Sequence, residues 1–407
     1  MRIGIVGGGA AGMFCAANLN ALKHQVVVLE KNADTLKKLL ITGHGRCNVT
    51  NLKQPEQFLE NVPHNKNFLF SAINTFSPNN LVEFLNNNKI ETMQEDNNRI
   101  FPKTNKAQTI KNCFDALASF NADVKLETEV LSVSKQDGVF EVKTCNGTYF
   151  FDALIIATGG VTYPTTGSTG FGYNVANSFN VDTIKPRASL CGIRLKNTPT
   201  NLEGTPLNCK LSILEGNKVV ATNLGEFLFT SFGVSGPNVF TLSAKTEKHS
   251  IAGNVLSFDL LPNLSSEQIK QTLKTYFKNN ATKFVFHALN GLINQKLAKF
   301  ILAKCDVLEN KQCANISNDE LNKIAEALKT LRFEIDNFDN LERATITRGG
   351  VSVKEINPKT MECKKVENLF FIGEVLDVDG LSGGYNLQIA FSTAVACANY
   401  LNGLGGN

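Results

Sequence analysis

The sequence lacks most of the features that mark membrane, secreted or metal-binding proteins. It contains no uninterrupted apolar run of the ~18 residues that a membrane-spanning helix needs. No basic and apolar leader precedes its first predicted strand. Its ten cysteines form no Cys-x-x-Cys pair and have no histidine partners at the spacing of zinc ligands. These absences predict a cytoplasmic protein with no membrane span, no metal and no disulfide framework, in which most cysteines are small buried residues.

Internal repeats and linker-like compositions are missing as well, so domains have to be inferred from the pattern of strands and helices. A chain of 407 residues suggests two or three domains. Strands and helices alternate at both ends of the sequence, which is typical of α/β proteins with a parallel, doubly wound sheet. A hairpin is expected with strands Val130–Ser134 and Val139–Lys143. In the middle, short strand-like runs are followed by helical spacings, which are Ile269, Leu273, Phe277 and Leu321, Ile324, Leu328. We therefore expect a Rossmann-like nucleotide-binding domain (1–187 and 346–407) interrupted by a β-rich insert (188–262) and a small helical insert (263–345).

The first twelve residues form an apolar strand that runs directly into a glycine-rich turn. Gly7, Gly9 and Gly12 fit the G-x-G-x-x-G spacing, and a predicted helix and a second strand ending at Glu30 follow. Gly7 allows the tight turn, Gly9 lets a pyrophosphate approach the backbone, and Gly12 lets helix and strand pack closely. Glu30 is placed to accept hydrogen bonds from ribose hydroxyls. A purely structural glycine turn is the alternative, but the order of strand, turn, helix, strand and acid favours a bound dinucleotide.

A late strand and helix favour a flavin over a nicotinamide as the resident cofactor. Phe370–Glu374 reads as a buried strand, and Gly383–Gln388 opens a long apolar helix. Flavoproteins of the two-dinucleotide-binding-domain type place such a pair beside the ribityl chain and the isoalloxazine, where Glu374 or Asp377 would hydrogen-bond. A glycine turn that merely caps a packing helix is the alternative. Because no second G-x-G-x-x-G follows a strand, no separate NAD(P) domain is expected.

The net charge of +4 is concentrated in one stretch. Residues 265–330 contain ten lysines and six acids, and the rest of the chain balances at 31 basic and 31 acidic residues. A basic helical module would suit a polyanionic substrate, and a solvated helical surface is the plainer alternative.

Longer motifs make the sequence resemble a known family. They are, in chain order, Lys38–Asn51, Tyr163–Tyr173, Gly225–Pro237, Thr347–Val351 and Gly373–Gln388. The set resembles the BaiN-type flavoproteins, described as NAD(P)/FAD-dependent or aminoacetone-oxidase-family oxidoreductases, over essentially the whole chain. This resemblance implies an FAD domain with a Rossmann-like core, a β-rich insert and a small helical insert. Two departures are minor: His44 replaces a more usual Asn, and Phe171 replaces an acid and could alter a substrate contact.

The motifs and the resemblance together define the expected site. The expected cofactor contacts are Gly7, Gly9, Ala10, Ala11, Gly12, Glu30, Lys31, Lys38, Gly45, Arg46, Cys47, Val130, Thr158, Gly159, Gly160, Gly373, Glu374, Asp377, Gly384, Tyr385, Asn386, Leu387 and Gln388. The candidate catalytic residues are Arg46 and Arg348 as clamps on a carbonyl or phosphate, Cys47 as a general acid and Tyr163 as a hydroxyl donor.

Each catalytic candidate has a structural alternative. The arginines could instead hold cofactor phosphate or a loop, and Cys47 and Tyr163 could only pack. His44 could donate a proton, although a structural loop histidine is the stronger interpretation. Gly349 and Gly350 are expected to let the backbone approach the isoalloxazine.

Members of the family look like reductases of a carbon–carbon double bond conjugated to a carbonyl. Proposed substrates are steroid-type enones and a uridine of 23S ribosomal RNA, which becomes dihydrouridine. In such chemistry hydride reaches the β-carbon, a donor polarises the carbonyl and an acid protonates the α-carbon. We expect an FAD-dependent reductase with NAD(P)H as transient electron donor and a small-molecule enone or ribosomal RNA as substrate. The Lys-rich insert favours RNA. An amine oxidase, or a flavin-containing RNA-binding or ribosome-binding protein without turnover, are the alternatives, and the sequence predicts no oligomeric state.

Overall fold

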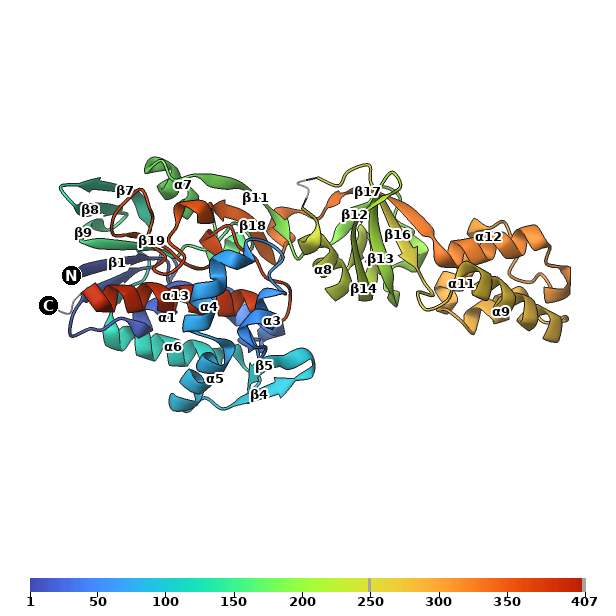
Figure 1. The fold of residues 1–407 in the computed structure, drawn as a ribbon, viewed down its shortest axis with the longest axis horizontal. Coiled ribbons are helices and arrows are strands. Elements are labelled where there is room, and N and C mark those ends of the chain that lie inside the picture. Colours follow the sequence, from blue (N-terminus) through green and yellow to red (C-terminus); the bar gives the residue numbers. More distant parts are fainter. Residues whose placement is uncertain (248–249, 405–407) are drawn as a thin grey trace. The chain divides into compact units, whose positions relative to one another are not determined.

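The computed structural model describes residues 1–247 and 250–404, which fold into two compact units (Figure 1). Unit 1 contains Met1–Ser189 and the chain from Leu341 onward, and unit 2 contains Leu190–Asn340. Unit 1 is therefore assembled from two segments that are far apart in sequence.

The centre of unit 1 is a five-stranded parallel sheet. Its strands lie in the order β19 (Leu369–Phe371), β10 (Ala153–Ile156), β1 (Arg2–Val6), β2 (Gln25–Leu29) and β6 (Asp123–Lys125). β1 pairs in parallel with β2 on one side and β10 on the other, so that Val6 lies opposite both Leu29 and Ile156. This order and direction confirm the expected Rossmann-like sheet.

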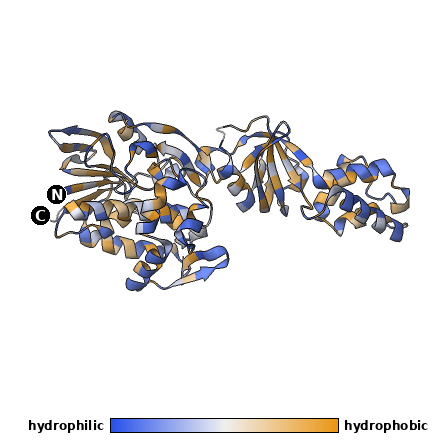
Figure 2. Ribbon diagram, viewed as in Figure 1, coloured by the Kyte–Doolittle hydropathy of each residue, from blue (hydrophilic) through white to orange (hydrophobic). Residues whose placement is uncertain are grey.

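Buried helices pack against that sheet. Phe14 of α1 (Ala10–Asn18) has its ring centroid 4.7 Å from that of Phe391 and 5.0 Å from that of Phe114, which joins α1 to α13 (Tyr385–Leu404) and α6 (Ala107–Asn121). α13 is buried along most of its length, as expected of a core helix, and Figure 2 shows hydrophobic residues along it. The other α-helices of unit 1 are α2 (Lys37–Ile41), α3 (Pro55–Leu59), α4 (Phe70–Thr75), α5 (Pro78–Asn87) and α7 (Phe171–Ser178).

Three small antiparallel sheets complete unit 1. They are β3 (Thr50–Asn51), β5 (Arg99–Pro102) and β4 (Thr92–Glu95); β7 (Val130–Gln136), β8 (Val139–Thr144) and β9 (Gly147–Phe151); and β11 (Thr183–Ser189) with β18 (Ile346–Val351). The β7–β8 hairpin occurs where the sequence predicted one. The β11–β18 pair brings Arg187 opposite Arg348 and Ala188 opposite Thr347.

Unit 2 contains a closed six-stranded barrel. Its strands lie in the order β12 (Ile193–Leu195), β15 (Gly233–Ser235), β14 (Lys218–Thr230), β13 (Pro206–Glu215), β16 (Val255–Asp259) and β17 (Leu331–Phe338), and β17 pairs back to β12. Phe229 and Phe258 stack inside at 5.6 Å with their rings 10° apart. The helix α8 (Pro237–Lys245) packs on β14.

A small helical part is inserted between β16 and β17. It consists of α9 (Ser266–Asn279), α10 (Val285–Asn290), α11 (Gln295–Lys304) and α12 (Asn318–Lys329). The apolar spacing predicted for α9 is observed, because Ile269, Leu273 and Phe277 are all buried. The expected helical insert 263–345 ends too late, since β17 returns to the barrel and pairs with β16 and β12.

The predicted burial of the cysteines is confirmed. Cys145 is exposed, Cys113 is half-buried and the other eight are buried, and all ten are free thiols. Within the described residues, no helix is both long and apolar enough to cross a membrane.

Candidate functional site

The turn between β1 and α1 is closely packed at two glycines and open at the third. A Cβ on Gly12 would lie 2.0 Å from the Gly7 carbonyl oxygen, and one on Gly7, whose φ is 108°, would lie 2.6 Å from the Ala157 oxygen. A Cβ on Gly9, the residue that precedes α1, would meet no atom within 4 Å. Ala10 and Ala11 form the first helical turn. The helix N-terminus therefore faces open space, where an anionic group can approach its free N–H groups.

Glu30 lies beside this turn and is nearly buried. Its Oε2 accepts a hydrogen bond from Gly8 N at 2.7 Å, and its Oε1 accepts from Asn32 N at 2.8 Å. The carboxylate is therefore fixed at the edge of the open space. Lys31 donates to Thr169 Oγ1 at 3.3 Å, and Val130, the first residue of β7, is buried.

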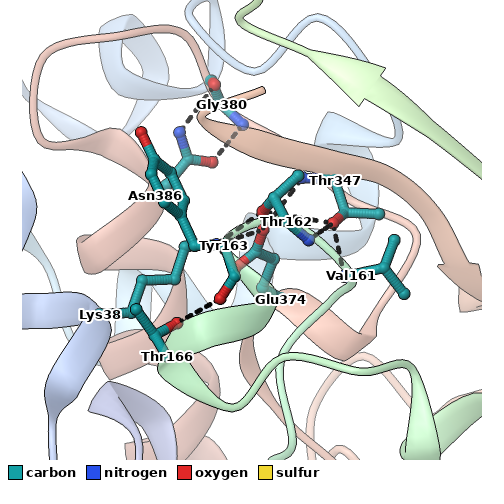
Figure 3. Close-up of polar contacts among 9 residues, drawn as sticks. All are labelled: Lys38, Val161, Thr162, Tyr163, Thr166, Thr347, Glu374, Gly380 and Asn386. Carbon is teal, nitrogen blue, oxygen red and sulfur yellow. Dashed lines mark hydrogen bonds and ion pairs between the residues drawn. The ribbon is translucent and has the colours of Figure 1, made fainter. Parts of the chain in front are cut away.

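A second cluster joins Lys38 to Glu374 (Figure 3). Lys38 Nζ lies 2.7 Å from Glu374 Oε2 and donates to Thr162 Oγ1 at 2.8 Å. Glu374 Oε1 also accepts from Thr347 N at 3.0 Å. The Tyr163 ring centroid lies 5.7 Å from Lys38 Nζ, and its φ of 53° is left-handed. Thus α2, the loop after β10, β18 and the turn after β19 all meet at one carboxylate.

The glycines around this cluster are required by close packing. A Cβ on Gly160 would lie 2.2 Å from Thr347 Oγ1, and one on Gly373, whose φ is 74°, would lie 2.7 Å from Ala11 Cβ. Gly159 has a φ of 70° and Gly384 one of 96°, where a Cβ would meet Thr50 at 2.4 Å. These contacts bring the glycine turn after β1 and the turn after β19 against each other.

A third cluster surrounds Arg348, which is almost fully buried. Its Nη2 donates to His64 Nδ1 at 2.8 Å, because a guanidinium has no acceptor, and its Nε lies 4.0 Å from Asp379 Oδ1. Asp379 is fully buried and its Oδ2 accepts from Ser189 Oγ at 2.7 Å. Burial raises the pKa of Asp379, and the positive charge of Arg348 offsets only part of that rise. His64 Nε2 lies 3.6 Å from Asp377 Oδ2.

Several buried polar atoms around these clusters lack a hydrogen-bond partner within the described residues. They are Asn48 Oδ1, Asn51 Oδ1, Thr158 Oγ1, Tyr173 OH, Asp377 Oδ1 and Asp379 Oδ1. Unpaired buried polar atoms are costly and are uncommon in folded proteins. Their concentration in the motif segments, together with the open helix N-terminus at Gly9, fits a large polar ligand such as FAD.

Three expected cofactor contacts, Arg46, Gln388 and Asn386, have partners within the protein. The Arg46 guanidinium pairs with Glu95, lies 4.2 Å from the Phe101 ring centroid and lowers the pKa of Glu95. Gln388 is fully buried, accepts from Thr50 Oγ1 at 2.7 Å and donates to the Phe76 oxygen at 3.0 Å. Asn386 clamps Gly380, to whose oxygen it donates at 2.9 Å (Figure 3). These side chains stabilise the fold through internal partners, and their expected contact with a cofactor stays a prediction.

Cys47 and the glycine pair of β18 are explained by packing within the protein. Cys47 is fully buried with a φ of 62°, and burial raises the pKa of its thiol to about 12, which favours packing over proton donation. A Cβ on Gly349 would lie 2.6 Å from the Lys185 oxygen, and one on Gly350 would lie 2.5 Å from the Val375 oxygen. The close approach of neighbouring backbone therefore explains both glycines without a cofactor contact. 

The remaining expected positions carry no contact that tests them. Gly45 has a φ of 82° and follows the exposed His44, and Tyr385 and Leu387 lie in the first turn of α13. Phe171 begins α7 and packs half-buried against the core of unit 1.

Sequence reasoning missed His64, Ser189 and Asp379. Asp379 lies inside a recognised motif, but His64 and Ser189 belong to none and reach Arg348 only through the fold. Thr162 and Thr347, which lie next to or within recognised motifs, were missed because nothing local shows that both bond to Glu374. Among the described residues, no group of three or more His, Cys, Asp or Glu side chains is placed to hold a metal ion.

Comparisons with known proteins agree with this geometry. The HI0933-like protein Rossmann domain matches residues 1–400. The chain is 31% identical to the ribosomal RNA dihydrouridine synthase of Escherichia coli (strain K12), over 98% of this chain and 97% of that protein. It is 32% identical to the protein of the same name from Haemophilus influenzae, over 97% and 96%. It is 28% identical to the 3-dehydro-bile acid delta(4,6)-reductase of Clostridium scindens, over 96% and 97%.

Among solved structures, the open conformation of a flavocytochrome c3 fumarate reductase superposes with a TM-score of 0.50 and 14% identity, covering 100% of this chain and 78% of that one. At this identity the likeness shows the fold alone, and that fold is the flavoprotein type expected from the sequence. The chain belongs to the HI0933-like family of Rossmann-domain proteins, and its curated relatives are oxidoreductases.

Proposed function

We propose that the protein is an FAD-dependent reductase of a carbon–carbon double bond conjugated to a carbonyl, and that its substrate is a uridine of 23S ribosomal RNA. The observation that carries the proposal is the identity above 30% to two ribosomal RNA dihydrouridine synthases over nearly the full length of each chain. The bile acid reductase at 28% identity supports the same bond chemistry on a different substrate.

The cofactor would lie along the three clusters. The open N-terminus of α1 suits the pyrophosphate, and Glu30 retains acceptor capacity for the ribose next to it. When bound, FAD would supply hydride transfer to the β-carbon of the substrate. Lys38, Thr162 and Glu374 hold the loop after β10 and the turn after β19 in one position, so that this binding surface is preorganised.

Arg348 is the residue proposed to polarise the substrate carbonyl. Its guanidinium is fixed by His64 and Asp379 and always carries its charge, so it can donate to an oxygen without rearranging. Because His64 Nδ1 accepts from Arg348, a neutral His64 carries its proton on Nε2, on the side of Asp377. We propose that His64, with its ring oriented by Asp377, positions Arg348, and that water supplies the proton to the α-carbon, because a neutral imidazole is too weak an acid to donate it.

The substrate proposal is tested by mass spectrometry of 23S ribosomal RNA nucleosides from a strain that lacks the gene. Dihydrouridine should disappear from one site, return with the wild-type gene and stay absent with Arg348→Met. Unchanged dihydrouridine in the deletion strain would eliminate the RNA substrate. Steroid-type enones assayed with the purified holoenzyme are then the next substrates to test.

The proposed electron donor has its own test. Anaerobic addition of NADH or NADPH to the yellow holoenzyme should bleach the flavin absorbance, and one of the two nucleotides should react faster. If neither nucleotide bleaches the flavin, NAD(P)H is not the donor.

A further inference from the structure

The helix α9 belongs to the helical part of unit 2 (Figure 1), and its sequence places lysines along one side. Lys270, Lys274 and Lys278 follow each other at intervals of four residues and therefore lie along one ridge of the helix. Lys274 and Lys278 are exposed and Lys270 is half-buried, whereas the residues that precede them, Ile269, Leu273 and Phe277, lie about 100° around the helix and are buried. We call these three residues the α9 ridge. The helix has a single acid, Glu267 in its first turn.

The α9 ridge lacks the ion pairs that neutralise other lysines nearby. In the helical part, Lys299 pairs with Glu309 at 3.1 Å, Lys311 with Glu320 at 2.6 Å, Lys323 with Asp319 at 2.8 Å and Lys329 with Asp259 at 2.8 Å. No ion pair joins a ridge lysine to any acid of the described chain. Like charges four residues apart destabilise a helix by about 0.2–0.5 kcal/mol per pair. The positive charge of the ridge is therefore not neutralised by the described acids and can bind an anion from outside the protein.

An exposed aromatic pair follows the ridge in sequence. Phe284 is 43% exposed although it is a large apolar side chain, and its ring stacks on that of His287 with centroids 6.2 Å apart and planes 14° apart. Lys283 is its exposed neighbour. Exposed ring faces beside lysines are the usual platform for unpaired bases, whose faces a duplex would hide.

Phe284 also lines a pocket of about 530 Å³. Hydrogen bonds from Val285 N to the Lys311 oxygen and from Cys313 N to the Lys283 oxygen, each 2.9 Å, join the two segments that form it. The amides of Asn310, Gln312 and Asn315 line the same pocket, together with Asp306 and the Lys311–Glu320 pair. Two carboxylates make it unsuitable for a phosphate. An uncharged ring with donors and acceptors on its edge fits these amides.

We propose that the helical part of unit 2 binds single-stranded RNA, with the α9 ridge on successive phosphates and Phe284 and its pocket on an unpaired base. This deepens the proposed function, because it rests on RNA being the substrate and identifies a part of the chain that would hold the RNA strand. The combination of a phosphate-binding ridge with a stacking platform favours an unpaired strand over a duplex.

Binding of a labelled oligouridylate to the full-length holoenzyme tests the ridge. The triple variant K270Q/K274Q/K278Q should bind at least about tenfold more weakly near 0.1 M salt, because log affinity falls with log salt by about 0.7 for each phosphate neutralised. The salt slope should therefore shrink by about 2. The matched control K196Q/K299Q/K323Q removes three lysines that are already paired with acids and should change affinity less than about twofold. Equal effects in both triple variants, or an unchanged salt slope in the ridge variant, would overturn the proposal.

Phe284→Ala tests the base platform separately. We expect binding of the oligouridylate to weaken about tenfold, and binding of an abasic strand with the same phosphates to stay unchanged. Equal losses on both strands would show that Phe284 supports the fold of the insert and does not stack on a base.

Nucleoside analysis of the complemented deletion strain separates this inference from the proposed function. If the wild-type gene restores dihydrouridine and the ridge variant, at the same protein level, restores it equally, the inference fails and the function stands. If the wild-type gene changes no dihydrouridine, the proposed function fails. Loss of restoration in the ridge variant alone supports both.

Discussion

Single glycines in the turn after β1 have two different physical roles. Gly7 and Gly12 are required because side chains there would collide with backbone oxygens, whereas Gly9 borders open space. The motif predicts this division, with Gly7 and Gly12 needed for the turn and for packing and Gly9 for access, and the approach of a pyrophosphate to Gly9 stays a prediction.

Gly9→Ala should therefore lower the FAD content, whereas Gly12→Ala should lower the free energy of unfolding. Gly9 has an ordinary φ of −82°, so alanine should leave the free energy of unfolding unchanged or raise it by up to about 1 kcal/mol, while FAD content falls. Gly12→Ala should destabilise by about 2 kcal/mol or more, because the new Cβ forces β1 and α1 apart. Urea unfolding of the apoprotein and the flavin absorbance of the purified protein measure the two effects. Full flavin content in Gly9→Ala would contradict the proposed phosphate position.

Asp379 should make stability depend on pH. Its raised pKa means that, between the ordinary Asp pKa and the raised one, the folded state keeps a proton that the unfolded state has lost. Stability should therefore fall as pH rises through that window, by up to about 1.4 kcal/mol per pH unit. Asp379→Asn, which can still accept from Ser189, should remove this part of the slope in urea unfolding between pH 4 and pH 7. Asp182→Asn, on the surface, is the control, and an equal change of slope there would contradict the assignment.

At the residue scale, local motifs predicted some contacts well and others poorly. Glu30 lies at the glycine turn as expected, because strand, turn and strand fix its position within thirty residues. Arg46 and Gln388 were assigned to a cofactor because they belong to motifs. Their actual partners, Glu95 for Arg46 and Thr50 and Phe76 for Gln388, are distant in sequence, so only the fold reveals them.

At the scale of elements, α13 is fastened to the rest of unit 1 by a buried polar side chain. Gln388 bonds to Thr50 of β3, to the Phe76 oxygen after α4 and to Ser392 one turn along the helix. These bonds hold the helix in register without any solvent contact.

Gln388→Leu should destabilise unit 1 and leave flavin binding intact. The substitution keeps a similar volume but leaves Thr50 Oγ1 without its buried acceptor, so we expect a loss of about 1–3 kcal/mol in the free energy of unfolding. Flavin content per folded molecule should equal that of the wild type, because the side chain faces the core. Loss of flavin at unchanged stability would indicate that the Gln388 side chain contacts the cofactor.

The sequence predicted individual helices and strands better than it predicted the domain to which each one belongs. The periodicities of α9 and α12 are local and were found, as was the β7–β8 hairpin. β17 was missed as a barrel strand because its partners, β12 and β16, precede the four insert helices. Neither hydrophobic spacing nor composition shows that a strand after the helices pairs with strands before them.

At the scale of the whole molecule, the Lys38–Glu374 pair joins the two segments that make up unit 1. The side chains are 23% and 19% exposed, so the pair is screened by solvent less than a surface pair.

A double-mutant cycle measures that link. Lys38→Met and Glu374→Gln should each destabilise, and their coupling energy should be about 1–3 kcal/mol because both share one hydrogen-bonded network. The control pair Lys103–Glu91 has the same 2.7 Å separation but side chains 68% and 73% exposed, and should show much weaker coupling. Equal coupling in the two cycles would mean that Lys38 and Glu374 contribute no more than a surface contact.

The interrupted construction of unit 1 has a consequence for biosynthesis. β10 lies between β1 and β19, yet β19 is translated only after the whole of unit 2 has been translated. A nascent polypeptide therefore has to keep one flank of its half-built sheet unpaired while the barrel and its helices are synthesised. That exposed flank is where a chaperone would be needed most, and where a translational pause within Leu190–Asn340 would do the greatest harm.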